Sequence, residues 1–250
     1  MPKKSPIGEV IIDLTEIDST NNYAMRLLNE GMAEHGVIIR ADFQTAGRGQ
    51  LGNVWQAEES KNLLMSVILD TSDFALEDQF YLNAATCVSL ADCLMSQYNL
   101  RDVSIKWPND IYAGNQKIAG ILIENNIRGH QWTNAILGIG LNVNQLHFQD
   151  LTRATSLQLQ AGKVLKINQV LKAVVKSLNA HMKLLDSDPA QVLRTYNHLL
   201  MGAGGTISFY RKHQLEEGLL LGANEQGLLE VQQGEKIRRF KHKEIDLVVA

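Results

Sequence analysis

Three apolar segments follow one another so closely between residues 103 and 143 that they restrict the chain to a meandering sheet. Segments 103–107, 117–124 and 133–143 are read as strands separated by short polar connections. A parallel connection needs a crossover of a dozen or more residues, so connections this short favour a mainly antiparallel or mixed sheet. Helical patterns elsewhere in the first two-thirds of the chain complete an α+β fold, with helices expected on one side of the sheet.

The hydrophobic periodicity of the rest of the chain predicts the remaining elements. Further strands are expected at 9–14, 36–43 and 62–69, and helices at 18–31, 76–98, 167–185 and 189–200. After the turn-rich "MGAGG" at 201–205, the pattern changes to short strands with turn signals, which is typical of a small β-barrel. We therefore expect a domain over residues 1–200 and a second, small domain over residues 203–250.

The overall charge and the first residues exclude several classes of protein. The net charge is −3, which gives no sign of a DNA or anionic-membrane partner. The start, "MPKKSPIGEV", has no apolar segment typical of a secretion signal, and no run of eighteen apolar residues could span a bilayer. Cys87 and Cys93 are expected to be buried, reduced thiols, and the scattered histidines do not predict a structural zinc. A cytoplasmic protein is the expectation.

The stretch "QTAGRGQLGNVW" holds a G-x-G-x-x-G pattern at Gly47, Gly49 and Gly52. The same pattern marks dinucleotide-binding folds, where a helix must start inside the loop because the pyrophosphate sits on its N-terminus. The residues that follow, "GQLGNVWQAEESKN", have no apolar face for such a helix. A dinucleotide fold is therefore disfavoured.

The same loop could instead bind an anion without a helix. Consecutive backbone N–H groups in a glycine-rich turn form a concavity for phosphate or carboxylate oxygens. Arg48 adds a guanidinium for bidentate contact, and Trp55 offers an aromatic face on which a purine could stack. The alternative is a surface turn that carries an exposed arginine and a core tryptophan.

A second cluster of polar residues lies in "IKWPNDIYAGNQKIAGILIE". Lys106, Asn109, Asp110 and Lys117 fall around two turns of the expected meander, and Gly120 would let a ligand approach the backbone. Taken singly, Asn109 and Asp110 could cap a turn, and Lys117 could be a solvated strand end. The two glycines of "GIGLNVN" would weaken a strand unless another group must approach it closely.

Five motifs together resemble the biotin–protein ligase family. They are, in family order, "GRGQLGNVW", "KWPND", "KIAGILIE", "GIGLNVN" and "ATSL". The resemblance covers nearly the whole chain and implies a catalytic domain of the class II synthetase and biotin/lipoate ligase fold, followed by a small SH3-like domain. Both agree with the elements expected above.

The resemblance implies a biotin–[acetyl-CoA-carboxylase] ligase that joins biotin to ATP as biotinyl-5′-adenylate, with Mg²⁺, and passes the biotinyl group to a lysine of a biotin carrier domain. A lipoate-type protein ligase of the same fold and a non-catalytic module that binds biotin or nucleotide are the alternatives. The "STNN" motif begins at residue 19, so we expect a monofunctional type without an N-terminal DNA-binding domain. The family includes monomers and homodimers, and the sequence does not choose between them.

The resemblance also assigns residues to each substrate. The catalytic residues are Lys117, Arg48 and Asp110. The residues implied around biotin are Ser19, Thr20, Asn21, Gln44, Arg48, Gly49, Gln50, Lys117 and Gly120. Those implied around ATP are Trp55, Asn142, Arg48, Lys106, Asn109 and Lys117.

Two of these assignments carry an open question. Asp110 could bind the metal ion or polarise the amine of the acceptor lysine, and the sequence leaves both roles open. Many family members have a second arginine where this chain has Gln50, so the lost charge puts tight retention of the adenylate in question.

Overall fold

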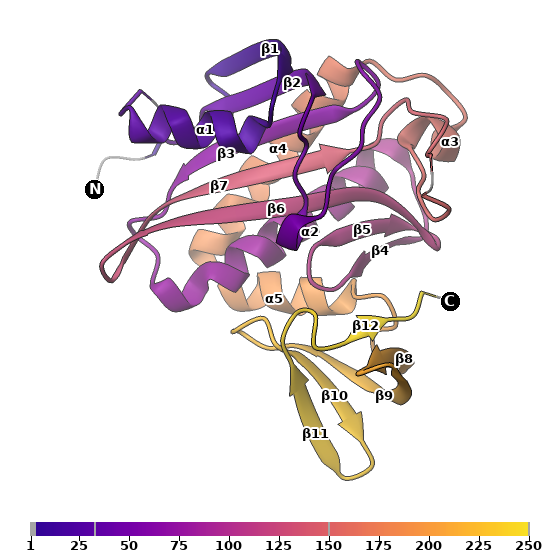
Figure 1. The fold of residues 1–250 in the computed structure, drawn as a ribbon. Coiled ribbons are helices and arrows are strands. Elements are labelled where there is room, and N and C mark those ends of the chain that lie inside the picture. Colours follow the sequence, from indigo (N-terminus) through magenta and orange to yellow (C-terminus); the bar gives the residue numbers. More distant parts are fainter. Residues whose placement is uncertain (1–3, 33, 150, 250) are drawn as a thin grey trace.

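The computed structural model describes residues 4–32, 34–149 and 151–249, and a seven-stranded mixed sheet forms its centre (Figure 1). The strand order is β1-β2-β3-β7-β6-β5-β4; β1 pairs with β2 in parallel, and every other pair is antiparallel. The strands are β1 (Ile11–Ile17), β2 (Ile38–Gln44), β3 (Leu63–Asp70), β4 (Val103–Lys106), β5 (Asp110–Ala113), β6 (Gln116–Arg128) and β7 (Gln131–Leu141).

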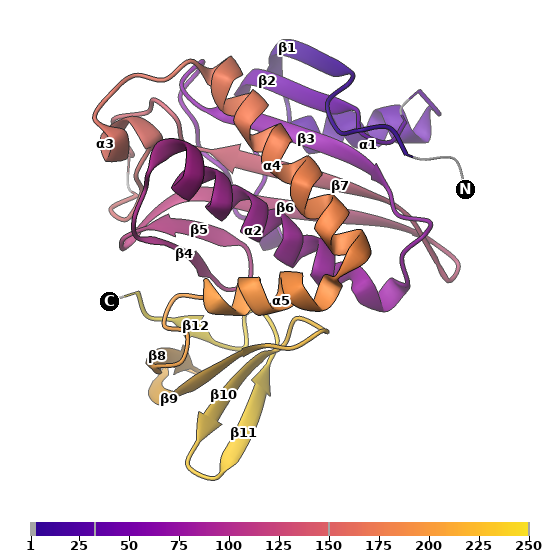
Figure 2. The same cartoon turned by 180° about the vertical axis from the view of Figure 1, so that it is seen from behind.

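Helices cover both faces of this sheet. On one face, α2 (Gln79–Tyr98) packs against β4–β6 and α4 (Ile167–Ser187) against β3, with α5 (Pro189–His198) beside them (Figure 2). On the other face, α1 (Thr20–Asn29) packs against β2, β3 and β7 (Figure 1). The expectation that helices lie on one side was therefore wrong for α1, whose short apolar stripe does not by itself indicate a face of the sheet.

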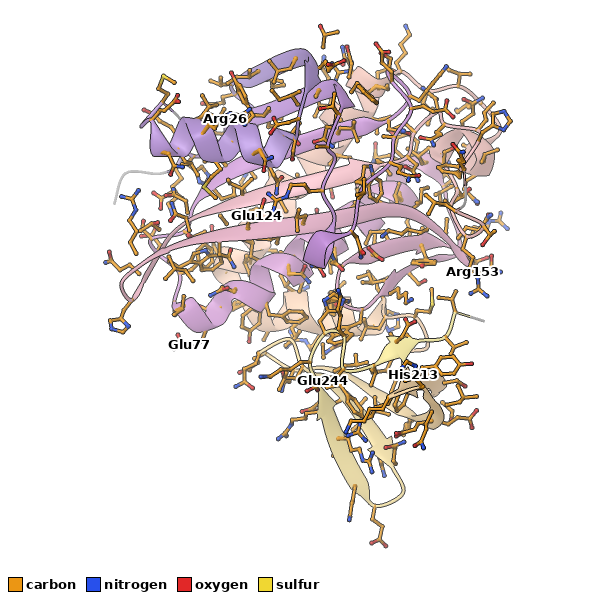
Figure 3. The ribbon with its side chains drawn as sticks, in the orientation of Figure 1. Arg26, Glu77, Glu124, Arg153, His213 and Glu244 are labelled. Atoms are coloured by element: carbon orange, nitrogen blue, oxygen red, sulfur yellow. The ribbon has the colours of Figure 1, made fainter. Side chains whose placement is uncertain are left out.

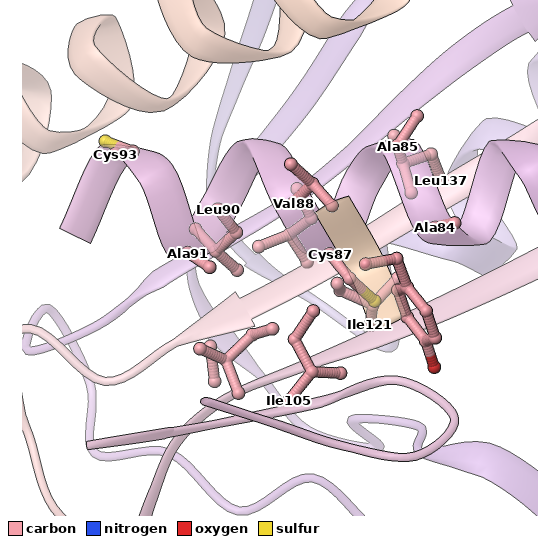
Figure 4. Close-up of a cluster of buried hydrophobic side chains, with 14 of the residues drawn as sticks. Ala84, Ala85, Cys87, Val88, Leu90, Ala91, Cys93, Ile105, Ile121 and Leu137 are labelled. Atoms are coloured by element: carbon pink, nitrogen blue, oxygen red, sulfur yellow. The ribbon is translucent and has the colours of Figure 1, made fainter. Parts of the chain in front are cut away.

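Burial explains why β3 lies in the middle of the sheet. Seven of its eight residues are buried, as expected for a strand that is covered on both faces. Toward α2 and α4 the core is continuous, and Figure 4 shows Cys87 of α2 beside Ile121 of β6. A smaller apolar cluster fills the space under α1, around Ile39 and Ile68.

Local sequence signals set several helix ends. The Asp188 carboxylate accepts a hydrogen bond from the Gln191 N–H at 2.8 Å, and Pro189 occupies the first turn of α5. Asn99 closes α2 with φ = 54°, a left-handed conformation that asparagine tolerates better than most residues. These caps define where α5 begins and where α2 ends.

A separate five-stranded antiparallel sheet follows α5 in the chain. Its order is β11-β10-β9-β8-β12. The strands are β8 (Thr206–Arg211), β9 (Gln214–Ala223), β10 (Leu229–Gln233), β11 (Lys236–Phe240) and β12 (Asp246–Leu247). Figure 1 shows this C-terminal sheet beneath α5, with β12 next to β4.

Hydrogen bonds and an ion pair connect the C-terminal sheet to the rest of the chain. The Trp107 indole N–H donates to the Gly227 carbonyl at 3.1 Å, and Lys106 Nζ lies 3.5 Å from Asp246 Oδ1. On α5, the Asn197 amide makes two hydrogen bonds with the Ala223 backbone, at 2.7 and 3.0 Å. These contacts place one end of the small sheet against β4 and the residues that follow it.

The fold class expected from the sequence is confirmed: an α+β fold with a mixed sheet, helices and a C-terminal antiparallel sheet. The sequence did not predict β5 or α3 (Leu157–Ala161), because four or five residues are too few to show a period. The division into domains over 1–200 and 203–250 stays a prediction, and residues 1–3, 33, 150 and 250 of that division lie outside the described residues. Among the described helices, none combines the length and apolarity needed to cross a bilayer. Both cysteines are free and buried, as expected.

We expect Asn197→Ala to loosen the junction between α5 and the C-terminal sheet. The change removes the side-chain amide that hydrogen-bonds to both the N–H and the carbonyl of Ala223. Each unpaired, partly buried backbone group lowers the stability of the fold by about 2 kcal/mol. Hydrogen exchange of residues 206–247 should speed up more than exchange in β3. Arg194→Ala, at an exposed position of the same helix, is the matched control. Equal exchange in both variants would contradict the prediction.

Candidate functional site

A cavity of about 130 Å³ opens on the α1 face of the sheet, between α1, the 44–55 loop and strands β5 to β7. It is lined by polar groups from the start of α1, by cationic groups from the loop and from β6, and by glycines of β6 and β7. Figure 1 shows the loop crossing in front of β7 and β6. Segments that lie far apart in the sequence therefore share one site.

Glycines form the floor of the cavity. Gly120 on β6 pairs with Gly140 on β7, and the Trp55 indole lies directly on both. A Cβ atom would come within 2.9 Å of the indole at Gly120 and within 2.5 Å at Gly140, so any larger residue would displace Trp55. The glycines thus provide the close approach that the sequence indicated, and the approaching group is a side chain of this protein.

A third glycine holds the start of α1 against the sheet. Any Cβ on Gly138 would collide with the amide oxygen of Asn21, the second residue of α1. The same oxygen lies 2.6 Å from the hydroxyl of Ser66, which is fully buried on β3. Asn21 is thereby fixed from two sides.

Hydrogen bonds extend from Ser66 into a chain of polar groups. Its hydroxyl lies 2.7 Å from Thr20 Oγ1, and the Thr20 N–H and hydroxyl both donate to Gln44 Oε1, at 2.8 and 3.0 Å. The Asn21 amide donates to Glu124 Oε2 at 2.8 Å. This end of the cavity consists of amide and hydroxyl groups in fixed orientations, which suits a ligand that needs both donors and acceptors.

Arg48 joins the glycine loop to this polar chain. Its guanidinium contacts both carboxylate oxygens of Glu124, at 2.9 and 3.2 Å, and donates to Asn22 Oδ1 at 2.8 Å. The Arg48 side chain remains 45% exposed, so the ion pair is accessible to an incoming anion. Figure 3 shows Glu124 on the sheet face below α1.

The helix itself is anchored by a second ion pair beside the site. Hydrogen bonds from Arg26, supported by Asn22, hold the pKa of the Asp18 carboxyl well below its usual range. Asp18 therefore stays ionised at any physiological pH and fixes the N-terminal turn of α1, from which Thr20 and Asn21 project.

The opposite end of the cavity is ionic. Lys117 Nζ lies 2.7 Å from Asp110 Oδ1 and 5.5 Å from the centre of the Trp55 ring. Asn109, beside Asp110, is buried and bonded through both its backbone and its side-chain amide to Ile121 on β6. Asp110 thus extends from a rigid turn, and among the residues that line the cavity it is the sole carboxylate.

The loop has no helix on which a dinucleotide pyrophosphate could sit. Within it, the structure describes only a three-residue 3-10 turn, η1 (Gln50–Gly52), and a narrow pairing of Arg48 with Val54. Two of its side-chain atoms, Gln50 Oε1 and Trp55 Nε1, are buried and have no hydrogen-bond partner among the described residues. They could pair with a ligand, because a buried polar group without a partner is costly.

Most residues expected at the site are brought together. Every residue expected around biotin lines the cavity, and so do Asp110 and the nucleotide candidates Arg48, Trp55, Asn109 and Lys117. Lys106 does not: it pairs with Asp246 of the C-terminal sheet. Asn142 is also outside the lining, because it is buried and its amide donates to the Thr155 carbonyl. The catalytic and binding roles themselves stay predictions.

Three residues of the site were missed from the sequence: Ser66, Glu124 and His242. Ser66 is the one hydroxyl in the apolar segment "NLLMSVIL", which was a signal that could have been used. Glu124 ends the motif "KIAGILIE", but its partner Arg48 is 76 residues away. His242 comes from the C-terminal segment after β11 and lies outside the motifs that predicted the site.

No group of three or more histidine, cysteine or acidic residues that could hold a metal ion occurs in the part of the chain that the structure describes. Asp110, the metal candidate, is already paired with Lys117. The residues therefore do not form a metal site of their own. The cavity instead offers two cations and a set of neutral polar groups, an arrangement that suits an anionic ligand with a polar head.

Comparisons with known proteins agree with this arrangement. Residues 14–142 match the model of the biotin/lipoate A/B protein ligase family. The bifunctional ligase/repressor BirA of Bacillus subtilis (strain 168) is 29% identical over 253 residues, covering 98% of this chain and 76% of that protein. The biotin–[acetyl-CoA-carboxylase] ligase of Mycobacterium tuberculosis is 28% identical over 171 residues, covering 68% of this chain and 62% of that protein.

A solved structure extends the likeness to the whole fold. The biotin protein ligase from Aquifex aeolicus, in complex with biotin and ATP, superposes with a TM-score of 0.81 at 28% identity. The match covers 97% of this chain and 100% of that one, so it includes the C-terminal sheet as well as the mixed sheet.

We expect Ser66→Ala to destabilise the fold by about 1–3 kcal/mol. The change leaves the buried oxygen of Asn21 without the hydroxyl beside it. Urea unfolding would measure the difference. Ser104→Ala, at a half-buried position on β4, is the control. A loss no larger than that of the control would show that the polar chain does not support α1.

Proposed function

Because the chain belongs to the biotin/lipoate A/B protein ligase family and is a biotin–protein ligase, we propose that it works in two steps. In the first step, the biotin carboxylate attacks the α-phosphate of ATP. The bond between the α- and β-phosphates breaks, pyrophosphate is released, and biotinyl-5′-adenylate is formed. In the second step, the ε-amine of a lysine on a biotin carrier domain attacks the acyl carbon, and AMP leaves.

The observation that carries this proposal is that Lys117 and Arg48, from distant parts of the chain, line one cavity together with the polar start of α1. The first step brings an anionic nucleophile to an anionic phosphate, and preorganised cations stabilise the charge that develops there. Each cation already has a carboxylate partner, Asp110 or Glu124. An anionic substrate would replace that partner, so each cation keeps a counter-charge when the substrate binds.

The polar chain at the start of α1 supports biotin over lipoate. The ureido ring of biotin carries two N–H donors and a carbonyl acceptor, whereas the dithiolane ring of lipoate has neither. Thr20, Asn21 and Gln44 present fixed hydroxyl and amide groups at this end of the cavity. A site built from such groups rejects a ligand that leaves them unpaired.

The nucleotide would lie between the loop and the sheet. One face of Trp55 rests on the glycine floor and the residue is only half-buried, so an adenine ring would stack on the part of the indole that solvent reaches. Magnesium would enter with ATP as part of that substrate, since the described residues form no metal site of their own. Of the two roles open for Asp110, its ion pair with the Lys117 ammonium favours the one toward the acceptor amine.

The test is a biotin-dependent exchange of labelled pyrophosphate into ATP, followed by transfer of labelled biotin to a biotin carrier domain. We expect biotin to support both reactions and lipoic acid to support neither, even in excess. Exchange with lipoic acid but not with biotin would favour the lipoate-type alternative. Tight binding of biotin without exchange or transfer would favour a non-catalytic module.

We expect Lys117→Ala to slow pyrophosphate exchange by about 10²–10³-fold, or roughly 3–4 kcal/mol, as for the loss of one preorganised charge-stabilising contact. The side chain is 31% exposed, so its removal should leave the fold intact, which circular dichroism would check. Lys172→Ala, at an exposed position on α4, is the control. Equal exchange rates in the two variants would remove Lys117 from the mechanism.

A further inference from the structure

His242 is the one residue of the C-terminal sheet among those that line the cavity. It follows β11 and precedes β12. The two-step reaction proposed above does not use it. A histidine supplied to the site by a separate sheet therefore needs its own explanation.

The position of His242 is set by contacts on both sides of the junction. Its ring meets Trp107 edge-on, with ring centres 5.7 Å apart and an angle of 88° between the planes. Trp107 is itself tied to the C-terminal sheet by the hydrogen bond to Gly227, and Lys106 by the ion pair with Asp246. The imidazole is therefore held at the wall of the cavity, while the residue keeps an exposed side through which protons can exchange with water.

The charges around His242 come from three elements. Asp110, at the start of β5, favours the protonated ring, whereas Lys106 at the end of β4 and Lys243 in its own segment oppose it. Partial burial is the largest influence, and the net result is that the pKa of His242 lies below its usual value. The imidazole is therefore neutral near pH 7 and can accept a proton.

The second step of the proposed reaction needs such a group. A lysine ε-amine is protonated near pH 7, and an ammonium has no lone pair with which to attack the acyl carbon. Asp110 can hold this ammonium, but a carboxylate is a weak base for it. A neutral imidazole at the same wall is a better proton acceptor.

We propose that His242 is the base that takes a proton from the acceptor lysine after Asp110 has bound its ammonium. The N–H bond of the ammonium breaks and the proton passes to the imidazole. The freed lone pair forms the amide bond to the biotinyl carbon, the bond from that carbon to the AMP oxygen breaks, and AMP leaves. The nitrogen becomes positively charged as it forms this bond, and it loses its second proton to water to give the neutral amide. The imidazolium then releases its own proton to water.

This inference rests on the proposed function, and its test separates the two half-reactions. The enzyme is first loaded with biotin and ATP, and transfer to a saturating concentration of a biotin carrier domain is then followed in a single turnover. We expect His242→Asn to slow transfer by about 100-fold, while pyrophosphate exchange stays within about twofold of the parent. His213→Asn is the control, because His213 is exposed in the turn between β8 and β9 of the same sheet.

The pH profile of biotin transfer distinguishes a catalytic base from a residue that only shapes the cavity. In the parent, transfer should fall as the pH drops through the pKa of His242, because the imidazolium cannot accept a proton. His242→Asn should lose this fall, and imidazole in solution should restore transfer to His242→Ala in proportion to its unprotonated form. A merely structural role would lower both half-reactions together and leave the shape of the profile unchanged.

Several outcomes would overturn the inference. If the parent carries out biotin-dependent exchange and His242→Asn transfers biotin at the parent rate, the inference about His242 is overturned and the proposed function stands. Equal losses of exchange and transfer in His242→Asn, with an unchanged pH profile, would also overturn only the inference about His242. A parent that carries out no biotin-dependent exchange would overturn the proposed function, and this inference with it.

Discussion

The site depends on the close approach of side chains to the backbone of β6 and β7, which three glycines permit. The Asn21 side-chain amide lies against Gly138, and the Trp55 indole lies against Gly120 and Gly140. A methyl group at any of these positions would push α1 or the loop away from the sheet, because neither strand can move without breaking its pairing on both sides. The absence of side chains at these points thus determines where the functional side chains lie.

Once α1 and the loop are in place, the neutral polar groups and the charged groups of the cavity are held in different ways. The neutral chain through Thr20, Asn21 and Ser66 is held by fixed hydrogen bonds, whereas Arg48 and Lys117 are held by carboxylates that remain partly exposed. Fixed dipoles suit recognition of a ligand's shape and polarity, and exchangeable ion pairs suit the binding of an anion. The two kinds of interaction match the two parts of an acid with a polar head group.

The C-terminal sheet contributes to the site because it is attached to the strands that carry Asp110. Trp107 and Lys106 lie just before the turn of Asn109 and Asp110, and both contact the small sheet. A shift of that sheet would therefore move His242 and the Asp110 turn together. The contacts of Trp107 and Lys106 thus fix the position of His242 relative to the turn that carries Asp110.

The sequence by itself determined the α+β class and the long strands and helices, because burial periodicity is a local property of the chain. The motifs that line the site were indicated by their joint resemblance to a known family. The sequence could not determine that α1 covers the face opposite α2 and α4, or that Lys106 and Asn142 do not line the cavity. Nor could it pair Arg48 with Glu124 or bring His242 to the cavity wall. Only the tertiary structure decided these points, because each depends on contacts between segments that lie far apart in the sequence, and no local pattern records which partner a side chain will meet.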